Sequence, residues 1–271
     1  MNCRCITMVV VLALLASGVA IAQDDDPILN GMVDIGGYEL YIDCQGEGSP
    51  TVVMEAGFGD TGRSWLRVHH KIAAFTRVCV YDRAGMGGSD PSPITPRTTQ
   101  VITDELHTLL HTAGIEGPYV LVGHSFGGYI VRLFAYTYPD EVAGLVLNHT
   151  PHEDQPTSDD RETRDRDELL FGAREPLTVG EWLDSMEEVR GTRSTDETFE
   201  LGELPLVVLT ALDYPPPIWP MELQEDLATL SENGTHIIVE DSGHYIHNDQ
   251  PEVFIDAVQE VVEAARASAE E

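Results

Sequence analysis

A serine flanked by glycines is the strongest chemical signal in this sequence. Ser125 stands at the centre of a G-x-S-x-G pattern at residues 123–127, after the apolar run 120–122 and before the helical segment 129–136. In a strand–turn–helix of this kind the turn is strained, and only small residues fit on either side of the serine. The serine is exposed at the N-terminus of the helix. The amide of Phe126 then points to where a substrate oxyanion would form. The pattern predicts that Ser125 is a nucleophile, with a purely structural serine as the alternative.

Short β-branched runs alternate with helical patterns along most of the chain, which is typical of a parallel sheet with crossover helices. The expected strands are residues 32–35, 39–44, 51–55, 77–81, 119–122, 143–147, 206–210 and 236–240. Helices are expected at 102–113, 223–230 and from Pro251 onward, where apolar residues recur on one face. Residues 152–203 are rich in Asp, Glu and Arg, and we interpret them as a small helical cap; a disordered acidic linker is the alternative.

Three further motifs follow expected strands. Residues 53–59 read VMEAGFG, residues 81–90 read YDRAGMGGSD and residues 241–244 read DSGH. Together with residues 123–127, these motifs make the chain resemble the α/β-hydrolase superfamily over nearly all of residues 23–271. The resemblance implies an α/β fold with a mostly parallel eight-stranded sheet flanked by helices, and the cap inserted after the sixth strand. It also implies a nucleophile after the fifth strand and a triad in the chain order Ser, acid, His.

The resemblance assigns the general base to His244, in the loop after the last strand. A base poised near neutral pH takes the Ser125 proton during attack and returns it to the leaving group. His247, three residues further on, is the rival for this role.

The resemblance also implies a second oxyanion donor in the loop after the third strand. Phe58 is the expected donor, through its backbone amide, and would act together with Phe126. The chain has Ala56-Gly57 where the commonest pattern in the family is His-Gly. Because donation is from the backbone, the change need not disable the site. The 82–89 loop is expected to be structural, with Asp82 and Arg83 able to pair locally.

The triad acid is the open question, because the family places it after the sixth or the seventh strand. No carboxylate directly follows the sixth strand, and Glu153 and Asp154 come several residues late. Asp213 directly follows the seventh strand in the right chain order, so it is our choice. Glu153 or Asp154 is the alternative. A degraded triad is another, and it would leave a hydrolase-like binding or signalling protein without turnover.

The first 22 residues have the features of a secretory signal peptide. Arg4 lies in a short basic head, an apolar run follows, and Ala20-Ile21-Ala22 precedes polar residues. The run is shorter than the roughly 20 apolar residues that span a membrane, so no stable anchor is expected after cleavage. The expected protein is therefore secreted or periplasmic.

Two cysteines, Cys44 and Cys79, remain after the signal peptide. In an exported protein they suggest one disulfide, with free buried thiols as the alternative. If the strands pair as the resemblance implies, the second strand lies beside the fourth and the two cysteines are neighbours.

The chain is strongly acidic, with 47 Asp and Glu against 15 Lys and Arg among 271 residues and a formal net charge of −32. Nucleic-acid binding needs clustered Lys and Arg, so no nucleic-acid partner is expected. We interpret the charge first as a solubility feature, with a cationic partner or substrate as the alternative.

His107 and His111 have the i, i+4 spacing of a metal-binding pair, but no third ligand is nearby in the sequence. Neither a metal nor an organic cofactor is therefore expected. The expected function is that of an exported serine hydrolase with a small-molecule acyl substrate. Carboxylic esters are the first choice of bond, and an aminopeptidase or amide hydrolase is the second.

Overall fold

The computed structural model describes residues 30–155, 187–191, 201–212 and 220–270. The expected signal peptide lies outside these ranges, as do most residues of the expected cap. Within the cap, residues 187–191 are described and form a helix. Within the described ranges, no helix is both long and apolar enough to cross a membrane.

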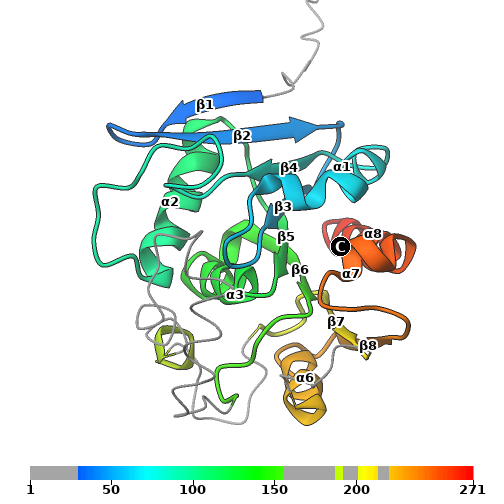
Figure 1. The fold of residues 1–271 in the computed structure, drawn as a ribbon. Coiled ribbons are helices and arrows are strands. Elements are labelled where there is room, and N and C mark those ends of the chain that lie inside the picture. The colour runs from blue at the N-terminus through cyan, green and yellow to red at the C-terminus, as the bar shows by residue number, and fades with distance from the viewer. Residues whose placement is uncertain (1–29, 156–186, 192–200, 213–219, 271) are drawn as a thin grey trace, which may run out of the picture.

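Eight strands form one sheet across the described part of the molecule (Figure 1). They are β1 (Asn30–Asp34), β2 (Glu39–Gln45), β3 (Thr51–Glu55), β4 (Val78–Tyr81), β5 (Tyr119–His124), β6 (Val142–Asn148), β7 (Leu206–Ala211) and β8 (Gly234–Val239). Their order in the sheet is β1-β2-β4-β3-β5-β6-β7-β8. Strand β2 is antiparallel to β1 and β4, and every other neighbouring pair is parallel. The predicted mostly parallel eight-stranded sheet is confirmed.

Helices cover both faces of this sheet, as Figure 1 shows. On one face lie α2 (Thr99–Thr112), α3 (Gly127–Thr137) and α6 (Met221–Ala228). On the other lie α1 (Leu66–Ile72), α7 (Ile246–Asp249) and α8 (Pro251–Ser268). Short 3-10 helices precede α1 (η1, Gly62–Trp65) and follow α3 (η2, Pro139–Glu141).

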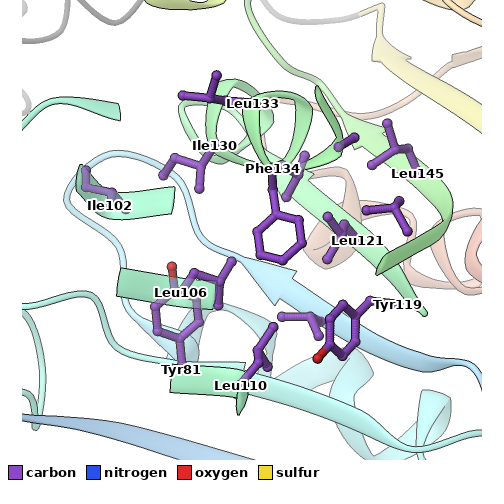
Figure 2. Packing of buried hydrophobic residues seen from close by; sticks show 14 of the residues in the cluster. Tyr81, Ile102, Leu106, Leu110, Tyr119, Leu121, Ile130, Leu133, Phe134 and Leu145 are labelled. Carbon is purple, nitrogen blue, oxygen red and sulfur yellow. The ribbon is translucent and has the colours of Figure 1, made fainter. Parts of the chain in front are cut away.

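The central strand β5 is buried along its whole length, so its end is held firmly by the core. Figure 2 shows the cluster on one face of the sheet, where α2 and α3 meet over β5. Its labelled members on these three elements are Ile102, Leu106, Leu110, Tyr119, Leu121, Ile130, Leu133 and Phe134. Each such side chain contributes about 1.5 to 3 kcal/mol when fully buried. A rigid support of this kind suits a strand that must present a reactive residue at its end.

A disulfide joins β2 to β4, as expected. Cys44 and Cys79 are directly paired across the antiparallel strands, and their Cα atoms lie 4.0 Å apart. Both residues are buried in the core cluster that also contains α2 and α3.

Candidate active site

Ser125 occupies a strained turn between β5 and α3. Its φ of 51° lies in the left-handed region, which residues other than glycine rarely adopt. A Cβ atom at Gly123 would come within 2.7 Å of the Gly127 carbonyl oxygen. One at Gly127 would come within 2.5 Å of the Glu55 carbonyl oxygen. Both glycines are therefore required by close backbone approach, and the turn holds Ser125, which is half-buried, at the end of the sheet.

The loop after β3 lies directly against this turn. A Cβ atom at Gly57 would approach the Ser125 Cβ to 3.3 Å and the His124 Nδ1 to 2.8 Å. The next residue, Phe58, packs its ring edge-to-face on the ring of Phe126, with centroids 5.8 Å apart. The two expected oxyanion donors thus belong to segments that meet beside Ser125.

Arg83 anchors the loop that carries Phe58. Its Nη1 donates to the Glu55 carboxylate at 2.6 Å and to the Ala56 carbonyl at 2.7 Å, and its Nη2 donates to the Gly57 carbonyl at 2.7 Å. The Tyr81 hydroxyl also donates to Glu55. Because Glu55 and Arg83 are buried, this charge-assisted network fixes the backbone of the loop.

Asp82 and Arg83 were expected to pair with each other, but each binds other partners. The Asp82 carboxylate accepts the backbone amides of Gly62 and Gly88, each at 2.8 Å. Asp82 thus closes its own loop, whereas Arg83 reaches across to the end of β3. A buried glutamate in an otherwise apolar strand was the signal in the sequence for this pair, since such a group needs a cationic partner.

His244 lies in the loop between β8 and α7, beside the turn that holds Ser125. Its carbonyl accepts the Nε2–H of His124 at 3.0 Å, and the two imidazole rings are 4.7 Å apart. Burial lowers the pKa of His244 to about 4, so its imidazole is neutral at pH 7. A neutral imidazole is in the right state to accept a proton.

His247, the rival base, is fully buried and packs on Trp65 with ring centroids 4.3 Å apart. Its Nδ1 accepts a hydrogen bond from the Asn148 side chain at 2.9 Å. Burial lowers its pKa to about 3. Asn148, at the end of β6, therefore binds a core histidine at one of the two strand ends where the resemblance leads us to expect a triad acid.

Asp213, the chosen triad acid, lies outside the described residues, but the end of β7 just before it is described. The amide of Ala211 donates to His149 Nδ1 at 2.9 Å. The ring of His149 in turn lies 5.2 Å from that of His244. Strand β7 therefore ends close to His244, two residues before Asp213.

The alternative acids, Glu153 and Asp154, are engaged by arginines. Glu153 is buried and accepts a hydrogen bond from Arg132 Nη1 at 2.5 Å. Burial raises the pKa of Glu153, but the positive charge of Arg132 outweighs this effect and holds the pKa well below its usual range. Asp154 accepts from Arg190 Nε at 2.9 Å. Both carboxylates thus help to attach the chain after β6 to α3 and to the helical residues 187–191.

Comparisons with known proteins agree with this arrangement. The alpha/beta hydrolase fold family matches residues 50–188. The chain is 28% identical to protein YqjL of Bacillus subtilis (strain 168) over 227 residues, covering 80% of this chain and 85% of that protein. It is 33% identical over 130 residues to the probable transporter efuK of Hormonema carpetanum. That second match covers 45% of this chain and spans only 19% of the length of the transporter.

Among solved structures, a thermophilic esterase from Thermogutta terrifontis has the same fold. It superimposes with a TM-score of 0.65 at 23% identity, covering 88% of this chain and 99% of the esterase. The sheet order, the glycine-bounded serine turn and the match over residues 50–188 lead to one conclusion. This chain belongs to the alpha/beta hydrolase fold family.

Proposed function

We propose that this chain is a serine hydrolase that cleaves carboxylic esters through an acyl-enzyme. The observation that carries the proposal is the strained turn at Ser125, with φ of 51° and glycines on both sides where nothing larger fits. Strain of this kind is retained only where the surrounding structure enforces it, and it is common at reactive centres.

In the proposed mechanism, Ser125 attacks the substrate carbonyl while His244 takes the hydroxyl proton. The amides of Phe58 and Phe126 stabilise the negative charge that develops on the carbonyl oxygen. His244 then gives its proton to the departing alcohol, which leaves an acyl group on Ser125. In the second half-reaction water attacks this acyl group while His244 takes a proton from the water, and His244 returns the proton to Ser125 as the acid is released. Asp213 fixes the imidazole tautomer and stabilises the imidazolium that forms in each half-reaction.

Two facts support esters as the first substrate class. The nucleophile position holds a serine, which forms an acyl-enzyme, and a protein with the same fold is an esterase. Amides are the second class. A panel of short- and long-chain esters and aminoacyl amides tests the choice, because an amide preference in kcat/KM would overturn it.

Export is part of the same proposal. It is supported by the signal-like residues 1–22 and by the Cys44–Cys79 disulfide, since disulfides persist in oxidising compartments. Fractionation of expressing cells with N-terminal sequencing tests it. A chain that stays inside the cell with residues 1–22 attached would contradict it.

A fluorophosphonate probe, which reacts with activated serines, separates an enzyme from a binding protein of this fold. Wild type should be labelled and Ser125→Ala should not. Ser268→Ala, which changes an exposed serine near the end of α8, is the matched control and should label like wild type. Absence of labelling in folded wild type, or labelling that survives Ser125→Ala, would favour the binding protein.

A further inference from the structure

A second cluster of histidines lies away from the candidate active site, on α2. His107 and His111 are one helical turn apart and so share a face of that helix. Their Nε2 atoms lie 3.1 and 3.0 Å from the two carboxylate oxygens of Glu141. The ligand atoms of these three residues all lie within 4.8 Å of one another.

Glu141 corrects the sequence-based expectation that no third ligand is close to the pair. It is 30 residues beyond His111, at the end of η2, and only the packing of α2 against α3 brings the two segments together. Figure 2 shows the apolar contact between these helices, with Leu106 and Leu110 on the α2 side.

The ring of His107 is held in a fixed orientation. It stacks on Tyr138 with ring centroids 3.8 Å apart and planes 8° from parallel. The Tyr138 hydroxyl donates in turn to Asp104 on α2 at 3.0 Å. Such supporting contacts orient imidazole ligands in metal sites and reduce the entropy lost on binding.

We propose that His107, His111 and Glu141 form a binding site for a divalent transition-metal ion of the Zn²⁺ class. Two imidazoles and one carboxylate are a ligand set that Zn²⁺ prefers, with bonds of roughly 2.0 to 2.2 Å. Ligand atoms around a tetrahedral ion are then about 3.3 Å apart, and one ligand atom from each of the three residues already lies within 4.8 Å of the others, so side-chain adjustments are enough to close the set around an ion.

The charge and exposure of the cluster fit an ion that keeps one water ligand. Partial burial raises the pKa of Glu141, but hydrogen bonds from His111 and His107 outweigh this and lower it, so the carboxylate is charged. The His111 side chain is 55% exposed, which leaves a coordination position open to solvent. On binding, each imidazole is neutral with its proton on Nδ1, so that Nε2 donates its lone pair to the ion, and any proton in excess of that one is released to solvent.

The bound ion would tie α2 to the connection between α3 and β6. This link lies at the far end of α3 from Ser125, because η2 follows the C-terminus of α3 and Ser125 precedes its N-terminus. The site therefore stabilises the fold and takes no part in the proposed reaction.

Metal titration of the full chain tests this site. After chelator treatment, ZnCl₂ binding is measured by calorimetry and by the shift in Tm, with CoCl₂ as a spectroscopic probe of imidazole ligation. His107→Gln, His111→Gln and Glu141→Gln should each weaken Zn²⁺ binding by about 100-fold or more, since even supporting residues cost 10- to 100-fold. His70→Gln, which changes an exposed histidine on α1, is the matched control and should bind like wild type.

The proposal fails if wild type binds no Zn²⁺, or if the three variants bind as tightly as wild type. It also fails if Ca²⁺ or Mg²⁺ raises the Tm as much as Zn²⁺ does, because oxygen-preferring ions would not select imidazole nitrogen. Since His111 is more than half exposed, His111→Gln leaves the core intact and keeps the test decisive.

Discussion

Histidines gather in two places, at opposite ends of α3, and their surroundings differ sharply. The interior group surrounds the Ser125 turn and consists of His124, His149, His244 and His247. The surface pair, His107 and His111, faces the Glu141 carboxylate. Burial lowers the pKa of each of these four histidines, so their rings are neutral at pH 7. The same residue type is thus prepared to accept a proton in one place and to bind a cation in the other.

Replacing His244 should give the largest difference between the two groups of histidines, because it should abolish turnover without affecting metal binding. We expect His244→Gln to lower kcat by about 10⁶-fold, because loss of a triad histidine removes the base while leaving binding intact. The variant should keep the Zn²⁺-induced rise in Tm. Ester hydrolysis and thermal unfolding are the measurements, with His70→Gln as the control. A kcat within tenfold of wild type would show that His244 is not the base.

Replacing Asp213, the proposed partner of His244, should give the next largest effect. Asp213→Asn should lower kcat by about 10⁴-fold with little change in KM, because the imidazole loses its correct tautomer. Steady-state kinetics measure this, and Asp256→Asn on the exposed side of α8 is the matched control. A normal rate in Asp213→Asn, together with a large loss in Glu153→Gln or Asp154→Asn, would move the acid to the segment after β6.

The interior histidines should also make stability depend on pH. In the unfolded chain a histidine takes up a proton below about pH 6.5, whereas folded His247 stays neutral down to about pH 3. The unfolded state therefore binds more protons in this window, and stability falls as the pH falls. His247 alone accounts for about 2 kcal/mol between pH 7.5 and 5. Urea unfolding at several pH values measures this slope. His247→Gln should flatten it, and an unchanged slope would contradict the assignment.

The smallest expected effect concerns the acid limb of the rate profile. Because burial lowers the pKa of His244 to about 4, kcat/KM should be nearly full at pH 5.5. An unshifted histidine with a pKa of about 6.5 would retain only about a tenth of the activity at that pH. Rates measured from pH 4 to 8 under conditions where the enzyme stays folded decide between the two. A midpoint near 6.5 would place His244 in a wetter site.

Much of the fold could be predicted because the strands that build it are locally encoded. β-Branched runs predicted all eight strands, and the glycines at 123 and 127 predicted the turn at Ser125. Helix boundaries were less accurate where polar residues define them. Helix α2 begins at Thr99 rather than 102, because the Thr98 side chain caps the amide of Val101.

Two contacts that sequence reasoning missed join distant segments. Neither the pairing of Glu55 with Arg83 nor the approach of Glu141 to His111 follows from local pattern, since both depend on how helices and loops cross the sheet. Asp213 stays a prediction because it lies outside the described residues. The end of a strand can be recognised in the sequence, but the direction of the next side chain cannot.

The Cys44–Cys79 bond encloses more than a piece of the sheet. The chain between these two residues contains β3, the Arg83-anchored loop with Phe58, and α1, so the covalent ring runs through one of the proposed oxyanion donors. Closing a ring of 35 residues is worth about 3 to 4 kcal/mol in the chain-entropy model. A chain made in a reducing compartment would lose that constraint from the segment that carries Phe58. Redox conditions during synthesis should therefore influence how well the Phe58 side of the candidate active site is formed.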